Sequence, residues 1–356
     1  MLKLRRGTVV EAEPLTVDVG GERRPAWADK GIVGPVEVGD EVVVNVEAAD
    51  LELGSGGFDV VHVNLSRGLE GGGLPGEHVM KLNYSSLQHA VRPVEPEGDE
   101  IAARATAPPA LVIPLHGYLA PVAWAAAQAT PGIRIGFVQG QGGALPGSMS
   151  RDVPALRSDG LLAGHVTAGP SHGGEHEAIS LAGGIDAAAG ELGWDALVVG
   201  PGPGILGSAS RLGHGGMAAL DGAHTALGLG LPTLLAPRLS SSDPRPRHRG
   251  LSHHSRTVLT MLLAPVRVPV PEAALEGWPV LEEDAPEGGR AQAALDDLIE
   301  TCGGRHDIAV QRVDLDGYAA SGLPAKTMGR TIDQDPLFFA AALAAGRALA
   351  HAVGRE

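Results

Sequence analysis

Hydrophobic and polar positions follow two different patterns along the chain, and the change falls near residue 100. Before it, short runs alternate apolar and polar side chains, as in GPVEVGDEVVVNVEA, where a Gly-Asp turn separates two such runs. Alternation with a period of two is typical of half-buried antiparallel strands. We therefore predict a small β-barrel or β-sandwich over residues 1–95. Its candidate strands are residues 8–10, 15–19, 41–46, 59–65 and 78–83.

A stretch rich in proline and acidic residues comes next, and we predict a linker at residues 96–110. From residue 111 to 356, continuous apolar runs alternate with glycine-rich loops and alanine-rich helical stretches, such as residues 177–192 and 208–229. Strands that are buried on both faces have continuous apolar sequences, and helices between them make the sheet parallel. This region is therefore expected to be an α/β domain with a mainly parallel, doubly wound sheet. Its candidate strands are residues 111–115, 133–138, 162–167, 196–199, 233–236, 266–270 and 308–313.

The last helix has a clear predicted start. Asp335 is placed to cap it, and Pro336 would occupy its first position, where proline is tolerated. In a doubly wound sheet, ligands bind beyond the carboxyl ends of the strands. Five predicted strands run into loops rich in glycine or polar residues, so we expect a site on that edge of the sheet. These loops begin at His116, Gly140, Gly169, Gly200 and Pro237.

The loop after Pro237 contains SSSDPRPRHRGLSHHS, an unusually basic stretch for a chain of net charge −15. Arg245, Arg247 and Arg249 alternate, so in an extended segment they would point the same way. The planar guanidinium group binds phosphate or carboxylate through two parallel hydrogen bonds. These three arginines are candidate anion-binding residues. A solvated basic loop paired with surface acids is the alternative.

The same stretch also offers candidate catalytic residues. Ser252 is expected to cap a helix, with His253 and His254 in its first turn. Histidine transfers protons near neutral pH, so either could act as the general acid or base. Asp243 and Glu175 are the candidates for an orienting or second catalytic carboxylate.

Gly202, Gly204 and Gly207 satisfy the pattern G-x-G-x-x-G after a predicted strand, and we expect a helix to begin there. Free amide groups at such a helix start bind phosphate or carboxylate, and Ser208 could add a hydroxyl. A dinucleotide site also needs an acidic residue at the end of the next strand, whereas Asp221 falls inside the predicted helix. We therefore favour contact with an anion over NAD binding. A purely structural turn stays open.

A metal site is not expected. His172 and His176 match the pattern H-x-x-E-H, which binds zinc on a helix, but two glycines between them weaken any helix there. No third ligand is evident from spacing. The single cysteine, Cys302, excludes an internal disulfide and a cysteine-rich metal site. Serine-hydrolase and Walker A patterns are also missing from the sequence, and the cofactor is left unknown.

Composition and charge limit the classes of partner that the chain is expected to bind. Nucleic acid is not expected, because the net charge is −15 and aromatic residues make up only 3%. The most apolar stretches, residues 111–129 and 337–353, are interrupted by His116, Pro121 and Arg347, so no membrane span is expected. The segment MLKLRRGTVV is no signal peptide, so a cytoplasmic location is expected. A homo-oligomer is left open.

Several long motifs resemble an uncharacterised bacterial family, the domain of unknown function numbered 3866. They are GPVEVGDEVVVNV, GGALP, TAG followed by GGE, GPGPGILGSASRLG, DPRPRHRGLSHHS, and MGR followed by DPLFF, and they cover nearly the whole chain. The resemblance implies no reaction, because the family has no assigned activity. It does imply that a carboxylate at Glu175 is a family feature and that His172 is not.

Together these features favour an enzyme that acts on a small anionic metabolite, either phosphorylated or carboxylated. The alternative is a non-catalytic protein that binds a nucleotide-like ligand and reports it through the β-rich domain. The sequence alone does not decide between an enzyme and a binding protein.

Overall fold

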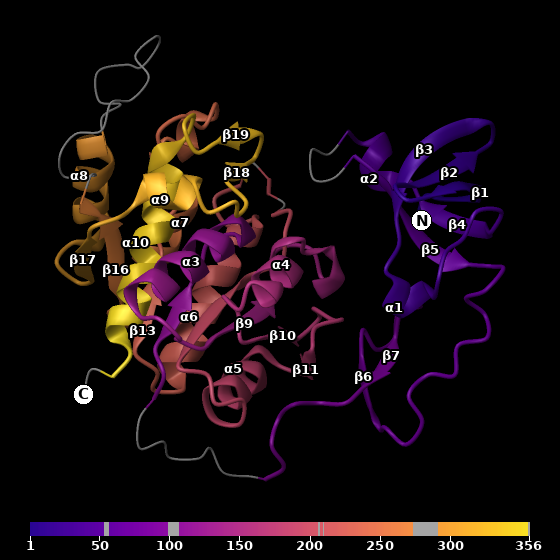
Figure 1. The fold of residues 1–356 in the computed structure, drawn as a ribbon, viewed down its shortest axis with the longest axis horizontal. Coiled ribbons are helices and arrows are strands. Elements are labelled where there is room, and N and C mark those ends of the chain that lie inside the picture. Colours follow the sequence, from indigo (N-terminus) through magenta and orange to yellow (C-terminus); the bar gives the residue numbers. More distant parts are fainter. Residues whose placement is uncertain (53–56, 99–106, 206, 209, 273–290, 355–356) are drawn as a thin grey trace. The chain divides into compact units, whose positions relative to one another are not determined.

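The computed structural model of the 356-residue chain describes residues 1–52, 57–98, 107–205, 207–208, 210–272 and 291–354. The chain divides into two compact units, Met1–Arg92 and Pro93–Glu356 (Figure 1). The predicted linker at 96–110 lies mostly outside the described residues, since residues 99–106 are not described. No helix in the described ranges is both long enough and apolar enough to span a bilayer.

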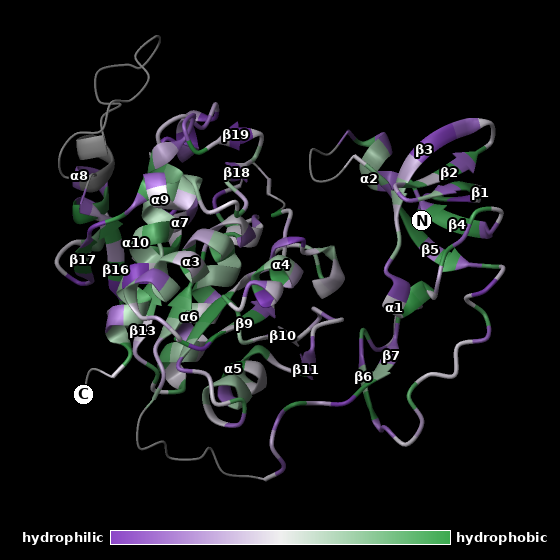
Figure 2. Ribbon diagram, in the orientation of Figure 1, coloured by the Kyte–Doolittle hydropathy of each residue, from purple (hydrophilic) through white to green (hydrophobic). Residues whose placement is uncertain are grey.

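The first unit is built around a closed five-stranded barrel, with strand order β1-β2-β3-β5-β4. Alternate valines of the predicted strands fill it, including Val9, Val17, Val42 and Val61. The sequence did not predict β3, because ERRPAW carries little apolar surface, and this strand is hydrophilic in Figure 2. The strands are β1 (Leu4–Ala12), β2 (Leu15–Val19), β3 (Glu22–Trp27), β4 (Glu41–Asn45) and β5 (Asp59–Asn64). Two short helices, α1 (Lys30–Val33) and α2 (Glu47–Asp50), and a hairpin of β6 (Val79–Lys81) and β7 (His89–Val91) complete the unit.

The second unit contains an eight-stranded sheet, and every strand pair in it is parallel. Its order is β11-β10-β9-β12-β8-β13-β16-β17, so the α/β prediction is confirmed. All seven predicted strands are present, and the sequence missed only β11, where His176 and Glu177 leave no apolar run. The strands are β8 (Ala110–Val112), β9 (Ile135–Gly140), β10 (Gly164–Ala168), β11 (His176–Ala178), β12 (Ala196–Pro201), β13 (Thr233–Leu235), β16 (Arg267–Pro271) and β17 (Asp307–Gln311).

Helices cover both faces of this sheet, which is why its central strands are fully buried. Helix α10 packs against α3 and against strands β8, β13, β16 and β17. Helix α5 packs against β9, β10 and β12, helix α6 packs against β8, β12 and β13, and the two helices contact each other. The longest helices of both layers are largely hydrophobic in Figure 2. The helices are α3 (Leu119–Ala129), α4 (Asp152–Ser158), α5 (Leu181–Gly190), α6 (Ala218–Gly228), α7 (His253–Met261), α8 (Ala291–Cys302), α9 (Leu315–Ala319) and α10 (Pro336–Ala352).

Two predicted helix starts are wrong. The helix expected over residues 208–229 begins only at Ala218, after the 3₁₀ turn η3 (Gly215–Met217), so Gly202–Gly207 opens no helix. The glycines at 213, 215 and 216 explain the delay, because glycine disfavours helix. The stretch 177–192 becomes helical only at Leu181, since β11 precedes it. Pro336 does occupy the first position of α10, but the side chain of Asp335 bonds no amide of that helix.

Candidate functional site

The candidate site lies where the connections of the parallel sheet reverse direction. From β8 the chain runs to β9 and then outward to β10 and β11. It returns to β12, which lies between β9 and β8, and then passes to β13, on the other side of β8. The loops that follow β12 and β13 therefore flank the carboxyl end of β8. In doubly wound sheets such a reversal leaves a crevice at the carboxyl edge, where ligands bind.

The basic stretch after β13 is an ordered excursion. It forms a two-stranded hairpin of β14 (Leu239–Ser240) and β15 (Gly250–Leu251), with the 3₁₀ turn η4 (Pro246–His248) between them. The Tyr118 hydroxyl donates to the carbonyl of Pro237 at 3.0 Å, and the Arg238 amide donates to Ser255 Oγ at 2.8 Å. These bonds connect the excursion to the 3₁₀ turn η1 (His116–Tyr118), which leads into α3, and to α7. The prediction of an extended segment with three arginines pointing the same way is therefore wrong.

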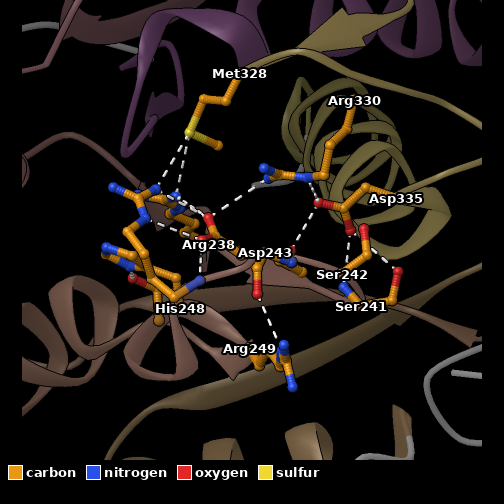
Figure 3. A network of polar contacts seen from close by, with 12 residues as sticks. Arg238, Ser241, Ser242, Asp243, His248, Arg249, Met328, Arg330 and Asp335 are labelled. Atoms are coloured by element: carbon orange, nitrogen blue, oxygen red, sulfur yellow. Dashed lines mark hydrogen bonds and ion pairs between the residues drawn. The ribbon is translucent and has the colours of Figure 1, made fainter. Parts of the chain in front are cut away.

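A buried carboxylate, Asp243, is hydrogen-bonded to two of the four arginines in this excursion (Figure 3). Arg245 donates to both of its oxygens at 3.0 Å, and Arg238 donates to Oδ2 at 3.0 Å. Burial raises the pKa of Asp243, but the hydrogen bonds and charges of Arg245 and Arg238 outweigh burial and hold that pKa well below its usual range. Asp243 is thus a fixed anion inside the protein. The structure does not support its predicted role as a catalytic carboxylate, nor Arg245 as a ligand-binding residue.

A second buried carboxylate, Asp335, extends this arrangement to the start of α10 (Figure 3). It accepts hydrogen bonds from Ser240 Oγ at 2.7 Å and from the Ser241 amide at 2.8 Å. Arg330 joins the two carboxylates, with Nε 3.0 Å from Asp335 Oδ2 and Nη2 3.5 Å from Asp243 Oδ2. We call Asp243, Asp335, Arg238, Arg245 and Arg330 the carboxylate network.

Two of the predicted anion-binding arginines, Arg247 and Arg249, have guanidinium N–H groups that donate no hydrogen bond within the described residues. Arg249 Nε donates to the main-chain carbonyl of Asp243 at 3.0 Å, and this is its side chain's one hydrogen bond within the described residues. Arg247 is exposed, and no hydrogen bond or ion pair joins it to another described residue. Both guanidinium groups could therefore bind an external anion.

Four histidines pack against one another beside these arginines, and we call His214, His248, His253 and His254 the histidine cluster. His214 comes from the loop after β12, His248 from η4, and the other two from the first turn of α7. Ser252 caps α7 as predicted, with its hydroxyl accepting from the His254 amide at 3.3 Å. The rings of His214 and His254 are stacked with centroids 3.6 Å apart, and those of His253 and His254 are 4.3 Å apart.

The hydrogen bonds of the cluster leave ring nitrogens without partners. His214 Nε2 lies 3.0 Å from the carbonyl oxygen of Arg211, which can only accept, so Nε2 carries the proton. In the neutral ring the lone pair is then on Nδ1, which is buried and has no hydrogen-bond partner. His253 Nε2 is likewise buried without a partner. His248 differs, because its Nδ1 is hydrogen-bonded to Ser252 Oγ at 2.8 Å.

The cluster is neutral at physiological pH. Burial lowers the pKa of His254 to about 2, with further lowering by the neighbouring histidines and Arg238. Burial, followed by the charges of Arg238 and Arg245, lowers the pKa of His248 to about 3. The pKa values of His214 and His253 are also lowered, again chiefly by burial. Neutral imidazoles present lone pairs, which can accept a proton or bind a metal ion.

The glycine-rich loop after β12 carries His214 into the cluster. A Cβ at Gly202 would collide with the carbonyl of Ala144, so glycine is required there by packing. Gly207 forms a β-bridge with His214, and Ser208 Oγ donates to the Gly213 carbonyl at 2.9 Å. Gly204 has a φ of +74°, the left-handed region that favours glycine.

The predicted anion role of Gly202, Gly204, Gly207 and Ser208 has no support in these contacts. Among the described residues, no hydrogen bond joins this loop to the arginines of the basic stretch. The contact between the two loops is made instead by the rings of His214, His253 and His254.

Glu175 lies away from the histidine cluster. It accepts from the amide of His165, at the amino end of β10, and forms an ion pair of 2.6 Å with Arg157. That position is on the opposite edge of the sheet, so the structure does not support a catalytic role for Glu175 beside His253 and His254. The H-x-x-E-H segment is not helical: Gly173 has a φ of +78° and the chain turns there into β11.

Two histidines at this carboxyl edge of the sheet, His214 and His116, are not among the site residues predicted from the sequence. His214 was not singled out, because nothing in its local sequence distinguishes it from the other histidines. His116, after β8, was noted only as the start of a polar loop; its Nε2 lies 2.8 Å from Ser150 Oγ. That hydroxyl also accepts from the Val153 amide at 3.1 Å, in the first turn of α4, and His116 Nε2 lies 3.9 Å from Asp152 Oδ2.

Comparison with known proteins identifies one match. A family model described as a protein of unknown function (DUF3866) matches residues 26–346, which include the histidine cluster and the carboxylate network. No curated protein and no solved structure matches the chain.

Proposed function

We propose that this chain, which belongs to the DUF3866 family of proteins of unknown function, is an enzyme that acts on a small anionic metabolite carrying a phosphate or a carboxylate. One observation carries the proposal. Neutral histidines with unpartnered nitrogens meet at the reversal point of a parallel sheet, where the charge of Arg247 acts on His214 and His253. Buried nitrogens without partners cost free energy in a structural core, so they point to a ligand or a reaction.

The charges around the cluster favour an anion. The excursion and its carboxylate network contain five arginines but only two carboxylates, Asp243 and Asp335. Both carboxylates are already bonded to arginine, and neither is hydrogen-bonded to a histidine of the cluster. The site is therefore locally positive in a chain whose net charge is −15. Such a site attracts anionic ligands.

The space beside the cluster limits what can enter it. A cavity of about 10 Å³, lined by Pro114, Gly216, Ala236, His254 and Ser255 among others, adjoins the cluster. A volume of this size holds about one water molecule. We therefore infer that only the reacting group of a substrate reaches His254, while its anionic group stays outside with Arg247 and Arg249.

Binding is the first test. Thermal-shift measurements with inorganic phosphate, nucleotides and small carboxylates should reveal a ligand that raises the melting temperature. The double variant Arg247→Ala/Arg249→Ala should weaken that ligand at least tenfold. The matched control is Arg267→Ala, because Arg267 pairs with Asp307 at the amino end of β16, on the other edge of the sheet. Equal weakening in both variants would contradict the proposed position of the anion.

Turnover decides between the proposal and its rival. The compounds that bind are incubated with wild-type protein and with His254→Ala, and product is measured. We expect conversion by the wild type and its loss in the variant. If the wild type binds a nucleotide-like ligand but converts no compound, and His254→Ala keeps the affinity, the chain is a non-catalytic binding protein.

A further inference from the structure

We propose that His214, His253 and His254 together bind a divalent transition-metal ion of the zinc type. Within the described part of the chain, these three residues each bring one ring nitrogen to a common place, with all three nitrogens within 4.8 Å of one another. Three imidazoles with a fourth position left open is the ligand set of a catalytic zinc site.

The hydrogen bond from His214 Nε2 to Arg211 leaves the other ring nitrogen, Nδ1, free to bind a metal ion. Histidines that bind metals usually donate the proton of the other nitrogen to a carbonyl or carboxylate, which fixes the tautomer and the ring orientation. His214 Nε2 donates to the Arg211 carbonyl at 3.0 Å, so Nδ1 faces the cluster with its lone pair. This arrangement is expected of a metal ligand.

The unpartnered nitrogens supply an independent argument. His214 is 7% exposed, and its Nδ1 has no hydrogen-bond partner; His253 Nε2 is buried and also lacks one. A buried polar atom without a partner is unfavourable, and this cluster holds two of them among the described residues. One metal ion would satisfy both nitrogens at once.

Gly216 leaves room for the ion. A Cβ on this residue would lie 2.9 Å from His254 Nδ1 and 3.0 Å from His214 Nδ1. Both nitrogens therefore face the same open side of the backbone at the start of α6. In a tetrahedral zinc site the ligand nitrogens are about 3.3 Å apart, so the three rings must draw together slightly. The rings of His214 and His254 are now only 9° from parallel, so their in-plane lone pairs do not converge; His254 would rotate toward the ion while His214 keeps its bond to Arg211.

The chemistry of the ion follows from its ligands. Three neutral imidazoles leave its double positive charge uncompensated, and no carboxylate of the described residues is hydrogen-bonded to the three rings. The open position would then take water or an oxygen of the anionic substrate, which the ion polarises as a Lewis acid. This role rests on the proposed function, whereas binding of the ion does not.

Metal content tests the inference without any substrate. The full chain, carrying no histidine tag, is dialysed against Zn²⁺ or Co²⁺ alone and then against buffer, and the bound metal is measured by elemental analysis. We expect one ion per chain in the wild type and in His62→Gln, a control in the barrel strand β5. The double variant His214→Gln/His253→Gln should lose at least nine-tenths of it. Bound Co²⁺ should also show the visible absorption of a tetrahedral site.

A second variant protects the test against misfolding. Gly216→Ala keeps all three histidines but puts a methyl group against the two Nδ1 atoms, so the rings must move away from it, and we expect at least tenfold weaker Zn²⁺ binding with unchanged far-ultraviolet circular dichroism. A metal-free wild type, or metal content that the double variant retains, would overturn the inference. Turnover of an anionic substrate by the metal-free protein would overturn the catalytic role of the ion, while leaving the proposed function standing. Stoichiometric metal without any turnover would support the site and count against the proposed function.

Discussion

The carboxylate network and the histidine cluster meet at the excursion from Arg238 to Ser255, yet the carboxylates of the network and the imidazoles of the cluster differ in how their polar atoms are satisfied. In the network, both carboxylates are fully buried and each accepts several hydrogen bonds, although Nε of Arg238 is buried without a partner among the described residues. In the cluster, His214 and His253 each hold a buried nitrogen without a partner. A polar group whose bonds are all internal stabilises the fold, whereas one that lacks a partner is available to a ligand. The comparison therefore distinguishes the residues that stabilise the fold around the site from those that are available to a ligand.

The largest effect on stability is expected from the network. Asp243→Asn removes a buried charge and leaves Arg238 and Arg245 facing a neutral side chain. Breaking a buried ion pair at one partner typically costs 3–5 kcal/mol, so we expect a loss of about 4 kcal/mol in the free energy of unfolding, measured with urea. The control is Asp307→Asn, an exposed partner of Arg267, with a loss below about 1 kcal/mol. Similar losses in both variants would show that the network is no more than surface pairing.

Acid should remove the contribution of the network. Because the pKa of Asp243 is lowered in the folded state, its stabilisation is present above the unfolded pKa, about 4, and is lost as the pH falls toward the folded value. The stability difference between wild type and Asp243→Asn should therefore stay constant from pH 7 to 5. Below pH 4 it should shrink by at most about 1.4 kcal/mol per pH unit. Urea unfolding of both proteins at pH 7, 5 and 3.5 checks this, and a difference that is unchanged at pH 3.5 would contradict it.

The histidine cluster should contribute little to stability. His253→Gln deletes an imidazole whose Nε2 has no hydrogen bond to lose. We expect the free energy of unfolding to change by less than about 1 kcal/mol, while ligand conversion is lost. Ser252→Ala is the comparison variant, because it removes the cap of α7 and should cost about 1 kcal/mol. A loss of several kcal/mol in His253→Gln would assign the cluster to the structural core.

The smallest change in stability is expected at Arg249. Its side chain makes one hydrogen bond, to a main-chain carbonyl, so Arg249→Lys should alter the free energy of unfolding by no more than about 0.5 kcal/mol. Binding of an anionic ligand should weaken by about 1–3 kcal/mol, because lysine cannot reproduce the two parallel hydrogen bonds of a guanidinium group. Calorimetric titration of the two proteins with the ligand found by thermal shift measures this. Unchanged affinity would place the anion elsewhere.

The sequence predicted the architecture better than the site, for a physical reason. Buried parallel strands have continuous apolar sequences, so β9, β12 and the other long strands were visible, whereas the polar strands β3 and β11 were not. The start of α7 was also visible, since Ser252 provides its own cap. These are local signals.

The interpretation of the basic stretch failed where it depended on distant residues. The sequence shows three arginines beside Asp243 but not that Arg330, 87 residues later, also bonds this carboxylate. It likewise does not show that Asp335, placed to cap a helix, accepts from Ser240 more than ninety residues earlier. His214 reaches His254 only because β12 and β13 lie on either side of β8. Such pairings arise from sheet topology, which local patterns do not contain.

Arg330 and Asp335 also determine when, during synthesis of the chain, the hydrogen bonds of the site can be completed. The excursion from Arg238 to Ser255 is synthesised early in the last third of the chain, but it needs both later residues to complete its bonds. Until they are translated, the carboxylate of Asp243 lacks one of its arginines, and Ser240 and Ser241 lack their acceptor. During biosynthesis the basic stretch therefore completes its hydrogen bonds only after the segment that leads into α10 has been translated. A product truncated before that segment would contain the histidines of the site without the bonds that hold the basic stretch in place.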